Sequence, residues 1–386
     1  MVIRADIDLG AIRHNARTLA RLAAPAALLG VVKADAYGHG AEQVANVLVE
    51  EGVQQLAVAT VGEAVQLREA GVTVPILVFA APLAESLAAY ARLELGVTVS
   101  SPEVAEAVVE AARVHGPLAC HVKVDTGMHR LGFSPEAVPE ALRYLAEAPG
   151  VSVDALWTHL ATADGDLDYA REQLRAFSAL VDRLGPLAPL TVHVANGPAL
   201  IRLTHEVARP STLIRAGGVL YGLSSSGDLA PEADAAGLKP AMRLSTRVVH
   251  LQTVEAGESV SYGRAWVAPE ARRIATLAAG YADGVPRALS SSGHVGIGGR
   301  LYPIAGRVCM DMLMVDLGPP QASAPGTERP HGSGAIRVGD EAVLFGPGGP
   351  DILRQADAAG TISYDLTCGL APRVARTWRD GAPGGP

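Results

Sequence analysis

Apolar and polar positions alternate in a repeating way over the first part of the chain, from about residue 28 to residue 223. Short apolar or β-branched runs are separated there by stretches rich in Ala, Glu and Leu, whose apolar spacing suits surface helices capped by Gly. Repeated strand-then-helix units require parallel strands joined by right-handed crossovers. The eight candidate strands are ALLGVVKA, QQLAVAT, VPILVF, LGVTVS, ACHVKVD, VDALWTHL, LTVHVAN and IRAGGVLYG. Eight such units predict an α/β fold, a (β/α)8 barrel of the TIM type.

The alternation ends in a small, polar, turn-forming segment, SSSGDLAPEADAAG, at residues 224–237. Shorter β-rich runs separated by Gly and Pro turns follow, which is typical of a mostly antiparallel domain. We therefore predict a barrel over 1–237 and a C-terminal β domain over 238–386, with the option that the first strand pairs with the β domain. Residues 319–336 read as a flexible surface insertion and the tail RDGAPGGP as disordered.

Composition and charge limit the class of partner. Of the 386 residues, 49% are hydrophobic and 19% charged, so the chain should bury a large interior. The net charge of -8 is scattered, and no Lys/Arg cluster has the length of a nucleic-acid or membrane patch. We expect a small-molecule substrate, with no nucleic acid and no membrane as partner.

Cysteines and the N-terminus add two further expectations. Cys120, Cys309 and Cys368 are too few and too far apart for a disulfide framework, and no CxxC motif or Cys/His cluster indicates a metal. The N-terminal MVIRADIDLG has acids where a signal peptide needs an apolar core. The longest uncharged run, over 70–84, is too short to span a membrane and contains two prolines. We therefore expect a cytoplasmic enzyme.

Polar residues stand next to several of the apolar runs, where barrel chemistry is expected because active sites lie at the C-terminal ends of the strands. A lysine at such a place is by itself more often a solvated surface group. Lys33, however, follows apolar residues in a strand expected to be buried on both faces, and burial favours the neutral amine that bonds to a carbonyl carbon. The polar residues are Lys33, Lys123, Asp125, His159, Asn196 and Arg215.

The segment VVKADAYGHG around Lys33 closely resembles the signature around the cofactor lysine of bacterial alanine racemases, pyridoxal-phosphate enzymes of fold type III. Other segments follow in the order and spacing of that family: VKVDTGMHRLG, WTHLATAD, HVANG, IRAGGVLYGL, SYGR, GYADG, RVCMD and TISYDLTCG. The resemblance covers nearly the whole chain, and together these segments are far more specific than any single motif. It implies a barrel joined to a C-terminal β domain, in a homodimer whose active sites are shared between the subunits.

The resemblance also implies the two catalytic residues. Lys33 would carry pyridoxal 5'-phosphate, which supplies the electron sink for the substrate carbanion, and would then act as a base. Racemisation needs a proton acceptor on one face of the substrate Cα and a donor on the other. Tyr262 of the other subunit would be the opposing base, although a tyrosine beside glycine in a β segment is by itself more often a half-buried strand residue.

Four further residues are assigned to the cofactor ring and the substrate by the resemblance. Arg215 would meet the pyridine nitrogen, and His159 would orient Arg215, unless His159 is only a satisfied core histidine. Arg130 would lie near the phenolic oxygen of the cofactor and the substrate carboxylate. Lys123 stands where many family members carry a carbamylated lysine that positions this arginine. Asn196 would complete the cofactor-binding set.

The cofactor phosphate would be bound by the hydroxyls of Tyr37 and Tyr364 and by the backbone N–H groups of Gly217 and Gly218. Family members commonly carry a serine after the asparagine that ends the preceding strand. Here Gly197 takes that place, which keeps the N–H group but removes a hydroxyl. We expect this departure to affect phosphate affinity.

Substrate access is the last feature that the resemblance assigns. The backbone N–H group of Met310 would meet the substrate carboxylate, although a methionine there could equally be core packing. The residues that resemble the lining of the family's entrance are Asp164, Tyr281, Arg287, Arg307 and Ile362.

The leading functional hypothesis is the interconversion of L-alanine and D-alanine, which supplies D-alanine for peptidoglycan. A broad-specificity or serine racemase on the same scaffold is an alternative. A non-catalytic pyridoxal-phosphate carrier would resemble the barrel alone, and the long β domain and Tyr262 argue against it. A related decarboxylase shares both domains, but GYADG and CMD fit the racemase pattern better.

Overall fold

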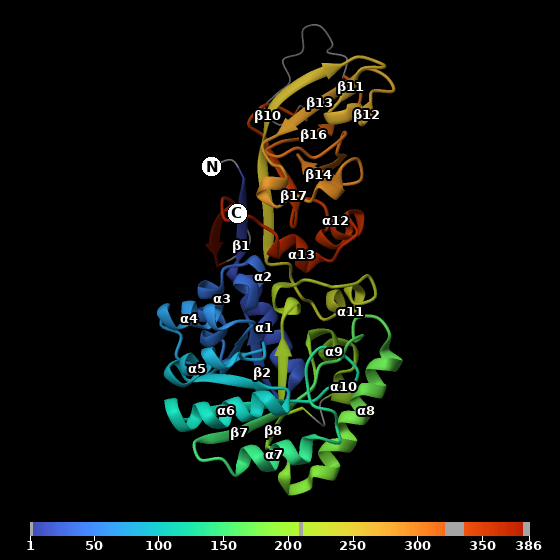
Figure 1. Ribbon diagram of the computed structural model, residues 1–386. Coiled ribbons are helices and arrows are strands. Elements are labelled where there is room, and N and C mark those ends of the chain that lie inside the picture. The colour runs from blue at the N-terminus through green and yellow to red at the C-terminus, as the bar shows by residue number, and fades with distance from the viewer. Residues whose placement is uncertain (1–2, 208–210, 321–335, 381–386) are drawn as a thin grey trace. The chain divides into compact units, whose positions relative to one another are not determined.

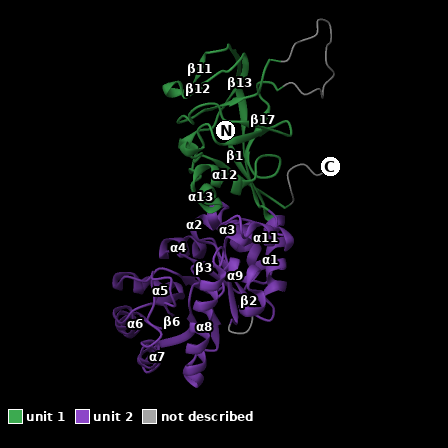
Figure 2. Ribbon diagram, turned by 90° about the vertical axis from the view of Figure 1, so that its right-hand side faces the viewer, with its two compact units in different colours: residues 1–9, 240–386 green, residues 10–239 purple. Residues whose placement is uncertain are grey.

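The computed structural model describes residues 3–207, 211–320 and 336–380, which form two compact units (Figure 2). Unit 1 comprises Met1–Leu9 and Pro240–Pro386, and unit 2 comprises Gly10–Lys239. The division therefore lies two residues from the predicted boundary and assigns the first nine residues to the C-terminal unit. Most of the predicted insertion, at 321–335, and the end of the predicted disordered tail, at 381–386, lie outside the described residues.

Unit 2 contains a single sheet of eight parallel strands in the order β8-β7-β6-β5-β4-β3-β2-β9. A bridge between Asn196 and Arg215, with a hydrogen bond of 2.8 Å from the Thr212 N–H group to the Val192 carbonyl, joins its two ends. The sheet therefore closes on itself, and the predicted barrel is confirmed. The strands are β2 (Ala27–Val31), β3 (Gln55–Val58), β4 (Ile76–Val78), β5 (Leu95–Val99), β6 (Leu118–Lys123), β7 (Val151–Trp157), β8 (Thr191–His193) and β9 (Leu213–Ala216).

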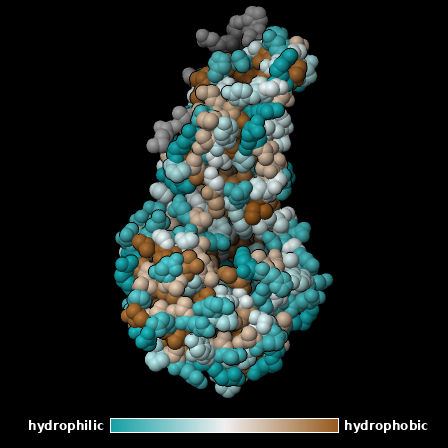
Figure 3. All heavy atoms as spheres, in the orientation of Figure 1, coloured by the Kyte–Doolittle hydropathy of each residue, from teal (hydrophilic) through white to brown (hydrophobic). Residues whose placement is uncertain are grey.

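Helices surround this sheet and connect consecutive strands (Figure 1). The longest, α8, buries residues three to four positions apart along one face, including Leu174, Phe177 and Leu184. Its other face belongs to the mainly hydrophilic flank of the unit seen in Figure 3. The helices are α1 (Leu9–Ala23), α2 (Lys33–Gly38), α3 (Ala41–Glu50), α4 (Val61–Glu69), α5 (Leu87–Leu93), α6 (Pro102–His115), α7 (Val138–Ala146), α8 (Leu167–Leu184), α9 (Gly197–Arg202), α10 (Thr204–Val207) and α11 (Ala230–Ala235).

Side chains fill the centre of the barrel, so that it is a core and not a pore. One layer consists of buried residues from four strands, against which the half-buried Tyr37 and Phe79 pack. This layer therefore packs the inside of the barrel. Its buried members are Leu29, Val31, Ala57, Leu77 and Leu213.

Unit 1 is a mostly antiparallel β structure, as predicted. Its main sheet has the strand order β15-β14-β17-β10-β1-β18, and β13 joins the long strand β10 to β16. The strands are β1 (Arg4–Asp8), β10 (Met242–Val254), β11 (Ser259–Val260), β12 (Trp266–Val267), β13 (Arg272–Leu277), β14 (His294–Ile297), β15 (Arg300–Pro303), β16 (Leu313–Asp316), β17 (Glu341–Phe345) and β18 (Ala375–Arg379), with the helices α12 (Ile352–Ala359) and α13 (Ser363–Cys368). Single turns of 3₁₀ helix occur in both units. Those of unit 2 are η1 (Ala84–Ser86), η2 (Gly185–Leu187) and η3 (Gly218–Tyr221), and those of unit 1 are η4 (Tyr262–Arg264), η5 (Tyr281–Asp283) and η6 (Arg287–Leu289).

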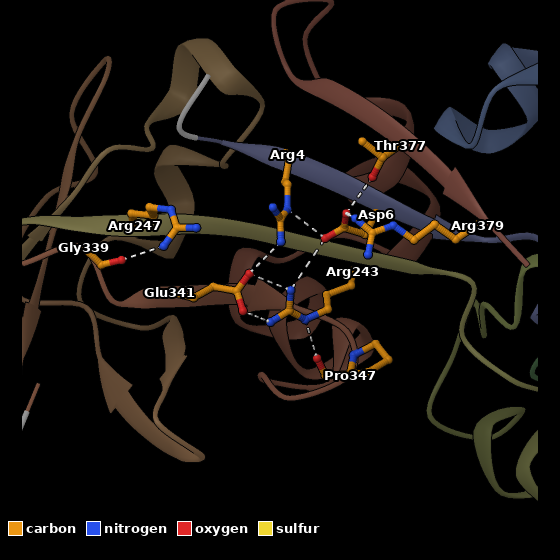
Figure 4. A network of polar contacts seen from close by, with 9 residues as sticks. All are labelled: Arg4, Asp6, Arg243, Arg247, Gly339, Glu341, Pro347, Thr377 and Arg379. Carbon is orange, nitrogen blue, oxygen red and sulfur yellow. Dashed lines mark hydrogen bonds and ion pairs between the residues drawn. The ribbon is translucent and has the colours of Figure 1, made fainter. Parts of the chain in front are cut away.

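The first strand belongs to unit 1 because β1 fills the place between β10 and β18, antiparallel to the former and parallel to the latter. A buried carboxylate fixes this position (Figure 4). Asp6 accepts hydrogen bonds from Arg4 at 3.0 Å and from the Thr377 hydroxyl at 2.6 Å. Glu341 of β17 extends the network by pairing with Arg4 at 3.1 Å and Arg243 at 2.6 Å. Four strands are therefore joined by charges that satisfy one another.

Candidate active site

Five of the polar residues predicted for the site lie at the C-terminal end of the barrel in unit 2. Lys33 follows β2, Lys123 ends β6, His159 follows β7, Asn196 follows β8, and Arg215 lies in β9. Because the strands are parallel, their C-terminal ends meet on one rim. The structure therefore brings together the set that the strand ends indicated.

The backbone directly after Lys33 has an unusual conformation. Ala34, Asp35, Ala36 and Tyr37 all have φ between 52° and 54° with ψ between 38° and 51°, or 52° at Ala34, which makes one left-handed turn without a glycine. Such a conformation costs about 1–2 kcal/mol for each L-residue. Strain of this kind persists only where surrounding contacts over-determine it, and it is concentrated at functional sites.

Hydrogen bonds hold both ends of this turn. The Ala34 N–H group donates to Oε1 of Glu63 at 2.6 Å, and the Gly40 N–H group donates to the Asp35 carbonyl at 3.0 Å. The His39 ring nitrogen Nδ1 lies 2.9 Å from the Tyr37 carbonyl oxygen. The turn places the Lys33 amine 5.9 Å from the centroid of the Tyr37 ring.

Arg215 is the most thoroughly fixed side chain of this rim. Nη1 donates to the His193 carbonyl at 2.7 Å and lies 3.1 Å from His193 Nδ1. Nη2 donates to the carbonyls of Thr158 and Val194 at 2.8 and 3.0 Å and lies 3.3 Å from His159 Nδ1. Among the described residues, no partner accepts from Nε and no carboxylate pairs with this guanidinium. Burial, followed by the charge of Arg130, lowers the pKa of Arg215 to about 9.

The imidazoles around Arg215 form a chain whose tautomers follow from the guanidinium. An arginine can only donate, so Nδ1 of His193 accepts and the ring proton lies on Nε2. His193 Nε2 lies 3.1 Å from Nδ1 of His121, so His121 accepts in turn. Burial lowers the pKa of His121 to about 4, and burial and Arg215 hold the pKa values of His159 and His193 well below 6.5. All three rings are neutral at neutral pH.

Neither His121 nor His193 was singled out by the sequence reasoning. His193 lies inside the quoted segment HVANG and His121 inside ACHVKVD, both in runs interpreted as strands. A polar residue at alternate positions of an otherwise apolar strand was the available signal. Which residue would pair with Arg215, however, depends on the register between neighbouring strands.

Lys123 lies beside these imidazoles and is buried. Its amine donates to the Leu131 carbonyl at 2.8 Å and lies 5.0 Å from the centroid of the Trp157 ring, over which Arg215 also packs at 5.0 Å. Burial, then Arg215, then Arg130, lower the pKa of Lys123 to about 8, against an opposing effect of Asp125. Arg130 itself is exposed, but its charge reaches Lys123, Arg215 and His159.

Two glycines, Gly217 and Gly218, follow β9 on the same rim. A Cβ on Gly217 would lie 2.7 Å from the Tyr37 hydroxyl oxygen, so only glycine lets this hydroxyl lie against the backbone at the start of η3. Within the described parts of the chain, nothing accepts a hydrogen bond from the N–H groups of Gly217 or Gly218. A hydroxyl and two N–H donors in one place suit a phosphate group. With the lysine at one side and the uncommitted Nε of Arg215, the residues present fit pyridoxal phosphate.

The surroundings of Gly197 explain why this chain has no serine at that position. A Cβ there would lie 2.5 Å from a methyl group of Val219, so the space that a serine side chain needs is occupied. Asn196 remains committed locally, since its Oδ1 accepts from the Ala199 N–H group at 3.0 Å and caps α9. Val219 therefore leaves no room for a hydroxyl-bearing side chain at position 197.

In unit 1, four of the predicted residues line one open cavity of about 520 Å3. Its other lining residues are Val308 and Cys309. The four are Tyr262, Tyr281, Arg287 and Arg307. All four are exposed, so this cavity presents two hydroxyls and two guanidinium groups to its surroundings.

The backbone beside Tyr262 is strained, as it is beside Lys33. Ser261 has φ 74° and ψ 174°, a region that is occupied almost only by glycine. Its side chain donates to the Arg307 carbonyl at 2.8 Å and accepts from the Arg307 N–H group at 3.0 Å. These reciprocal bonds join the turn carrying Tyr262 to the neighbouring loop of the cavity.

The loops that carry Tyr281 and Met310 are fixed to each other. The N–H groups of Tyr281 and Ala282 donate to the carbonyls of Cys309 and Met310, both at 3.0 Å. Arg373 donates to Asp283 at 2.7 Å and to Asp311 at 2.8 Å, one carboxylate from each loop. No described residue accepts from the Met310 N–H group, and the Met310 side chain is exposed and therefore does not serve as core packing.

Three other predicted residues lie outside these two groups. Asp164 of unit 2 accepts from the Ser225 hydroxyl at 2.6 Å, so this predicted entrance residue is tied to the segment that follows the barrel. Ile362 is exposed and Tyr364 is half-buried, both at the start of α13 in unit 1. In the described parts of the chain there is no cluster of three or more residues suited to a metal ion, and no helix with the length and apolarity of a membrane span.

Comparison with known proteins covers both units. A family model described as the alanine racemase N-terminal domain matches residues 7–225, and one described as the alanine racemase C-terminal domain matches residues 241–378. The chain is 40% identical to an alanine racemase of Cutibacterium acnes, over 97% of each chain. It is 39% identical to an alanine racemase of Chlorobaculum tepidum, over 96% of this chain and 94% of the relative.

Solved structures show the same correspondence. The alanine racemase of a D-cycloserine-producing Streptomyces lavendulae superposes with a TM-score of 0.88 at 34% identity, covering 99% of this chain and 98% of the other. A biosynthetic alanine racemase of Pseudomonas aeruginosa gives a TM-score of 0.85 at 36% identity, covering 98% and 99%.

Proposed function

Since the chain belongs to the alanine racemase family, we propose that it interconverts L-alanine and D-alanine, with pyridoxal 5'-phosphate bound at the C-terminal rim of the barrel. The observation that carries this proposal is the rim itself, where Lys33 after β2 stands with the Arg215 and His159 pair in a chain matched over both units. As a cytoplasmic enzyme it would supply D-alanine for peptidoglycan.

The proton transfers are the task of two side chains. When bound, pyridoxal phosphate supplies the electron sink that stabilises a carbanion at the substrate Cα. Lys33 would hold the cofactor covalently through Nζ, and its free amine would take or return the proton on one face of the substrate Cα. The Tyr262 hydroxyl serves the other face. Its exposure in an isolated chain supports its contribution from a second copy in a homodimer.

Arg215 controls charge at the cofactor ring. Its two terminal nitrogens are committed to carbonyls and imidazoles, which leaves Nε for the pyridine nitrogen. With a pKa of about 9 it stays protonated at neutral pH, and it donates a hydrogen bond without transferring the proton. Arg215 would therefore hold the pyridine nitrogen in a hydrogen bond without protonating it, and would so limit how much charge the ring withdraws.

The substrate carboxylate would be bound by Arg130 and by the Met310 N–H group. In a carbamylated form, Lys123 would position Arg130 for this role. The Lys123 pKa of about 8 leaves a neutral fraction of the amine at physiological pH. A neutral amine can attack carbon dioxide, forming the N–C bond of a carbamate while one amine proton leaves to solvent. That reaction replaces a cation by an anion beside two arginines, which supports carbamylation of Lys123.

Phosphate binding would use the Tyr37 hydroxyl and the N–H groups of Gly217 and Gly218, with Tyr364 as a further donor. The unit 1 cavity with Tyr281, Arg287 and Arg307 would form the entrance, with Asp164 and Ile362. Its two guanidinium groups suit an amino-acid carboxylate.

The direct test is to incubate the purified chain and pyridoxal phosphate with L-alanine, and separately with D-alanine, and to resolve the enantiomers over time. Both reactions should converge on equal amounts, because enantiomers have the same free energy. Serine and lysine should have lower specificity constants than alanine. Absence of the opposite enantiomer, or a higher specificity constant for serine, would contradict the proposal.

A further inference from the structure

The carboxylate of Glu63 accepts hydrogen bonds both at the start of its own helix, α4, and outside it. Glu63 is the third residue of that helix and forms a capping box with Thr60, in which its Oε2 accepts from the Thr60 N–H group at 3.0 Å. The same oxygen accepts from the Ala59 N–H group at 2.7 Å, at the end of β3. A helix cap is complete with these bonds.

The other oxygen of Glu63 leaves its own helix and reaches the neighbouring strand end. Oε1 accepts from the Ala34 N–H group at 2.6 Å, and Ala34 is both the residue after Lys33 and the first left-handed residue of the turn. β2 and β3 are adjacent and parallel, so this carboxylate bridges the C-terminal ends of two barrel strands. A bond from a backbone N–H group to a charged acceptor is among the stronger hydrogen bonds in proteins.

The position of this bond matters because a left-handed turn of four L-residues is strained. The turn contains no glycine, and contacts from outside it supplement its own backbone bonds, such as that from the Ala36 N–H group to the Val32 carbonyl at 2.9 Å. Asp35, His39 and Gly40 fix its far end. At the end that begins with Lys33, the Ala34 N–H group has Glu63 as its partner within the described residues.

We propose that Glu63 is a positioning residue for the active site, which holds the left-handed turn so that the Lys33 amine and the Tyr37 hydroxyl are presented to the same rim. The proposal rests on the proposed function for the roles of Lys33 and Tyr37. Releasing the Ala34 N–H group would let the first turn residues return to ordinary backbone angles, which would displace the amine while the cap of α4 could still form.

Substitutions at two positions, Glu63 and Thr60, separate the bond to Ala34 from the cap of α4. Glu63→Gln retains one acceptor oxygen but sets an NH2 group against either the Ala34 or the Ala59 and Thr60 donors, and Glu63→Ala removes all three bonds. Thr60→Ala is the matched control, because it removes the hydroxyl that accepts from the Glu63 N–H group at 3.3 Å and leaves the bond to Ala34 in place. Both positions weaken the cap, so a loss of stability alone does not distinguish them.

The first readout is amide hydrogen exchange of the segment 32–38, measured on the chain with and without cofactor. In Glu63→Gln it should speed up roughly tenfold or more, because in either orientation of the amide the Ala34 N–H group keeps at most a neutral acceptor, and in Thr60→Ala it should stay unchanged. The second readout is steady-state kinetics of the loaded enzyme. The kcat of Glu63→Gln should fall roughly 10- to 100-fold with KM nearly unchanged, since the amine is misplaced.

Equal exchange of 32–38 in Glu63→Gln and Thr60→Ala would overturn the proposal, as would equal kcat values. If Glu63→Ala does not fold, Glu63→Gln decides. Hydrogen exchange does not depend on racemisation, so a chain without racemase activity would contradict the proposed function while the bridge from Glu63 to Ala34 remained testable.

Discussion

The site residues of the two units differ in how far they are enclosed by their own chain. In unit 2, Arg215 and Lys123 expose 3% and 1% of their surface, and every acceptor around the guanidinium is uncharged. In unit 1, Tyr262 and Met310 expose 72% and 53%. The side chains of Arg215 and Lys123 are therefore enclosed by unit 2 itself. The cavity of unit 1, in contrast, presents large side chains that a single unit does not cover.

The two regions share one feature, which is strained backbone beside the expected base. Ala34 to Tyr37 are held by Glu63 and His39, and Ser261 is held by Arg307. The difference lies in what a substitution should disturb. A change in the barrel rim should affect both folding and chemistry because its side chains support one another, while a change in the unit 1 cavity should affect chemistry alone.

The largest effect is expected for Tyr262→Phe. Loss of a proton donor and acceptor should lower kcat by roughly 10²- to 10⁴-fold. Because the side chain is exposed, the free energy of unfolding should change by less than about 0.5 kcal/mol, and the visible absorbance of the bound cofactor should persist. Racemase assays and urea denaturation test this, with Tyr302→Phe in β15 as the control. Retained activity would remove Tyr262 from the mechanism.

Arg215→Lys should separate the two regions most clearly in stability. An ammonium group cannot reach the acceptors on Thr158, His193 and Val194 together, so buried polar atoms lose partners. The free energy of unfolding should fall by about 2–4 kcal/mol, measured by urea denaturation of both variants. Arg175→Lys, at an exposed position of α8, is the control with a small expected change. An unchanged midpoint for Arg215→Lys would show that the rim tolerates rearrangement.

Acid should destabilise the barrel rim through its neutral imidazoles. The unfolded chain takes up protons near pH 6.5, whereas His121, with a pKa of about 4, does not in the folded state. The stability that this difference contributes is present above pH 6.5 and is lost as the pH falls toward 4. His121→Asn keeps an acceptor for His193 and should make the pH dependence less steep, whereas exposed His115→Asn should not. A slope identical to that of the parent chain would argue against a neutral buried His121.

The smallest effect concerns the phosphate side of the rim. Gly197→Ser should lower the free energy of unfolding by about 1–3 kcal/mol, because the new side chain meets Val219. Adding Val219→Ala should recover most of that loss and raise the affinity for pyridoxal phosphate above that of Val219→Ala alone. Urea denaturation and cofactor titration measure these quantities. Full stability of the single variant would mean that Val219 moves aside freely.

The sequence predicted the barrel well because its strands are buried on both faces, and such strands are continuous apolar runs. Each of the eight runs overlaps one observed strand, and strand ends located Lys33, His159 and Arg215 on one rim. Local pattern carried no signal for the left-handed turn, since ADAY contains no glycine and one of the contacts that hold the turn comes from Glu63, 29 residues after Ala34.

Long-range pairing explains the remaining differences. The first strand pairs with residues near the other end of the chain, as in the bond between Asp6 and Thr377, and no local periodicity encodes that choice. His121 and His193 were overlooked because the contact of His193 with Arg215, and that of His121 with His193, depend on the register between strands. Several of the residues carried over from the resemblance lie together on the barrel rim or in the unit 1 cavity, and the roles of all of them stay predictions.

Mixing two inactive variants tests the central claim most directly, namely that a buried rim of one copy is completed by the exposed tyrosine of another. Lys33→Ala and Tyr262→Phe chains would be dissociated, combined in equal amounts and allowed to reassociate. If each site takes Lys33 from one copy and Tyr262 from its partner, half of the dimers are hybrids with one intact site, and about a quarter of the parent activity should return. If no activity returns although hybrid dimers form, both residues act from the same chain and the claim is contradicted.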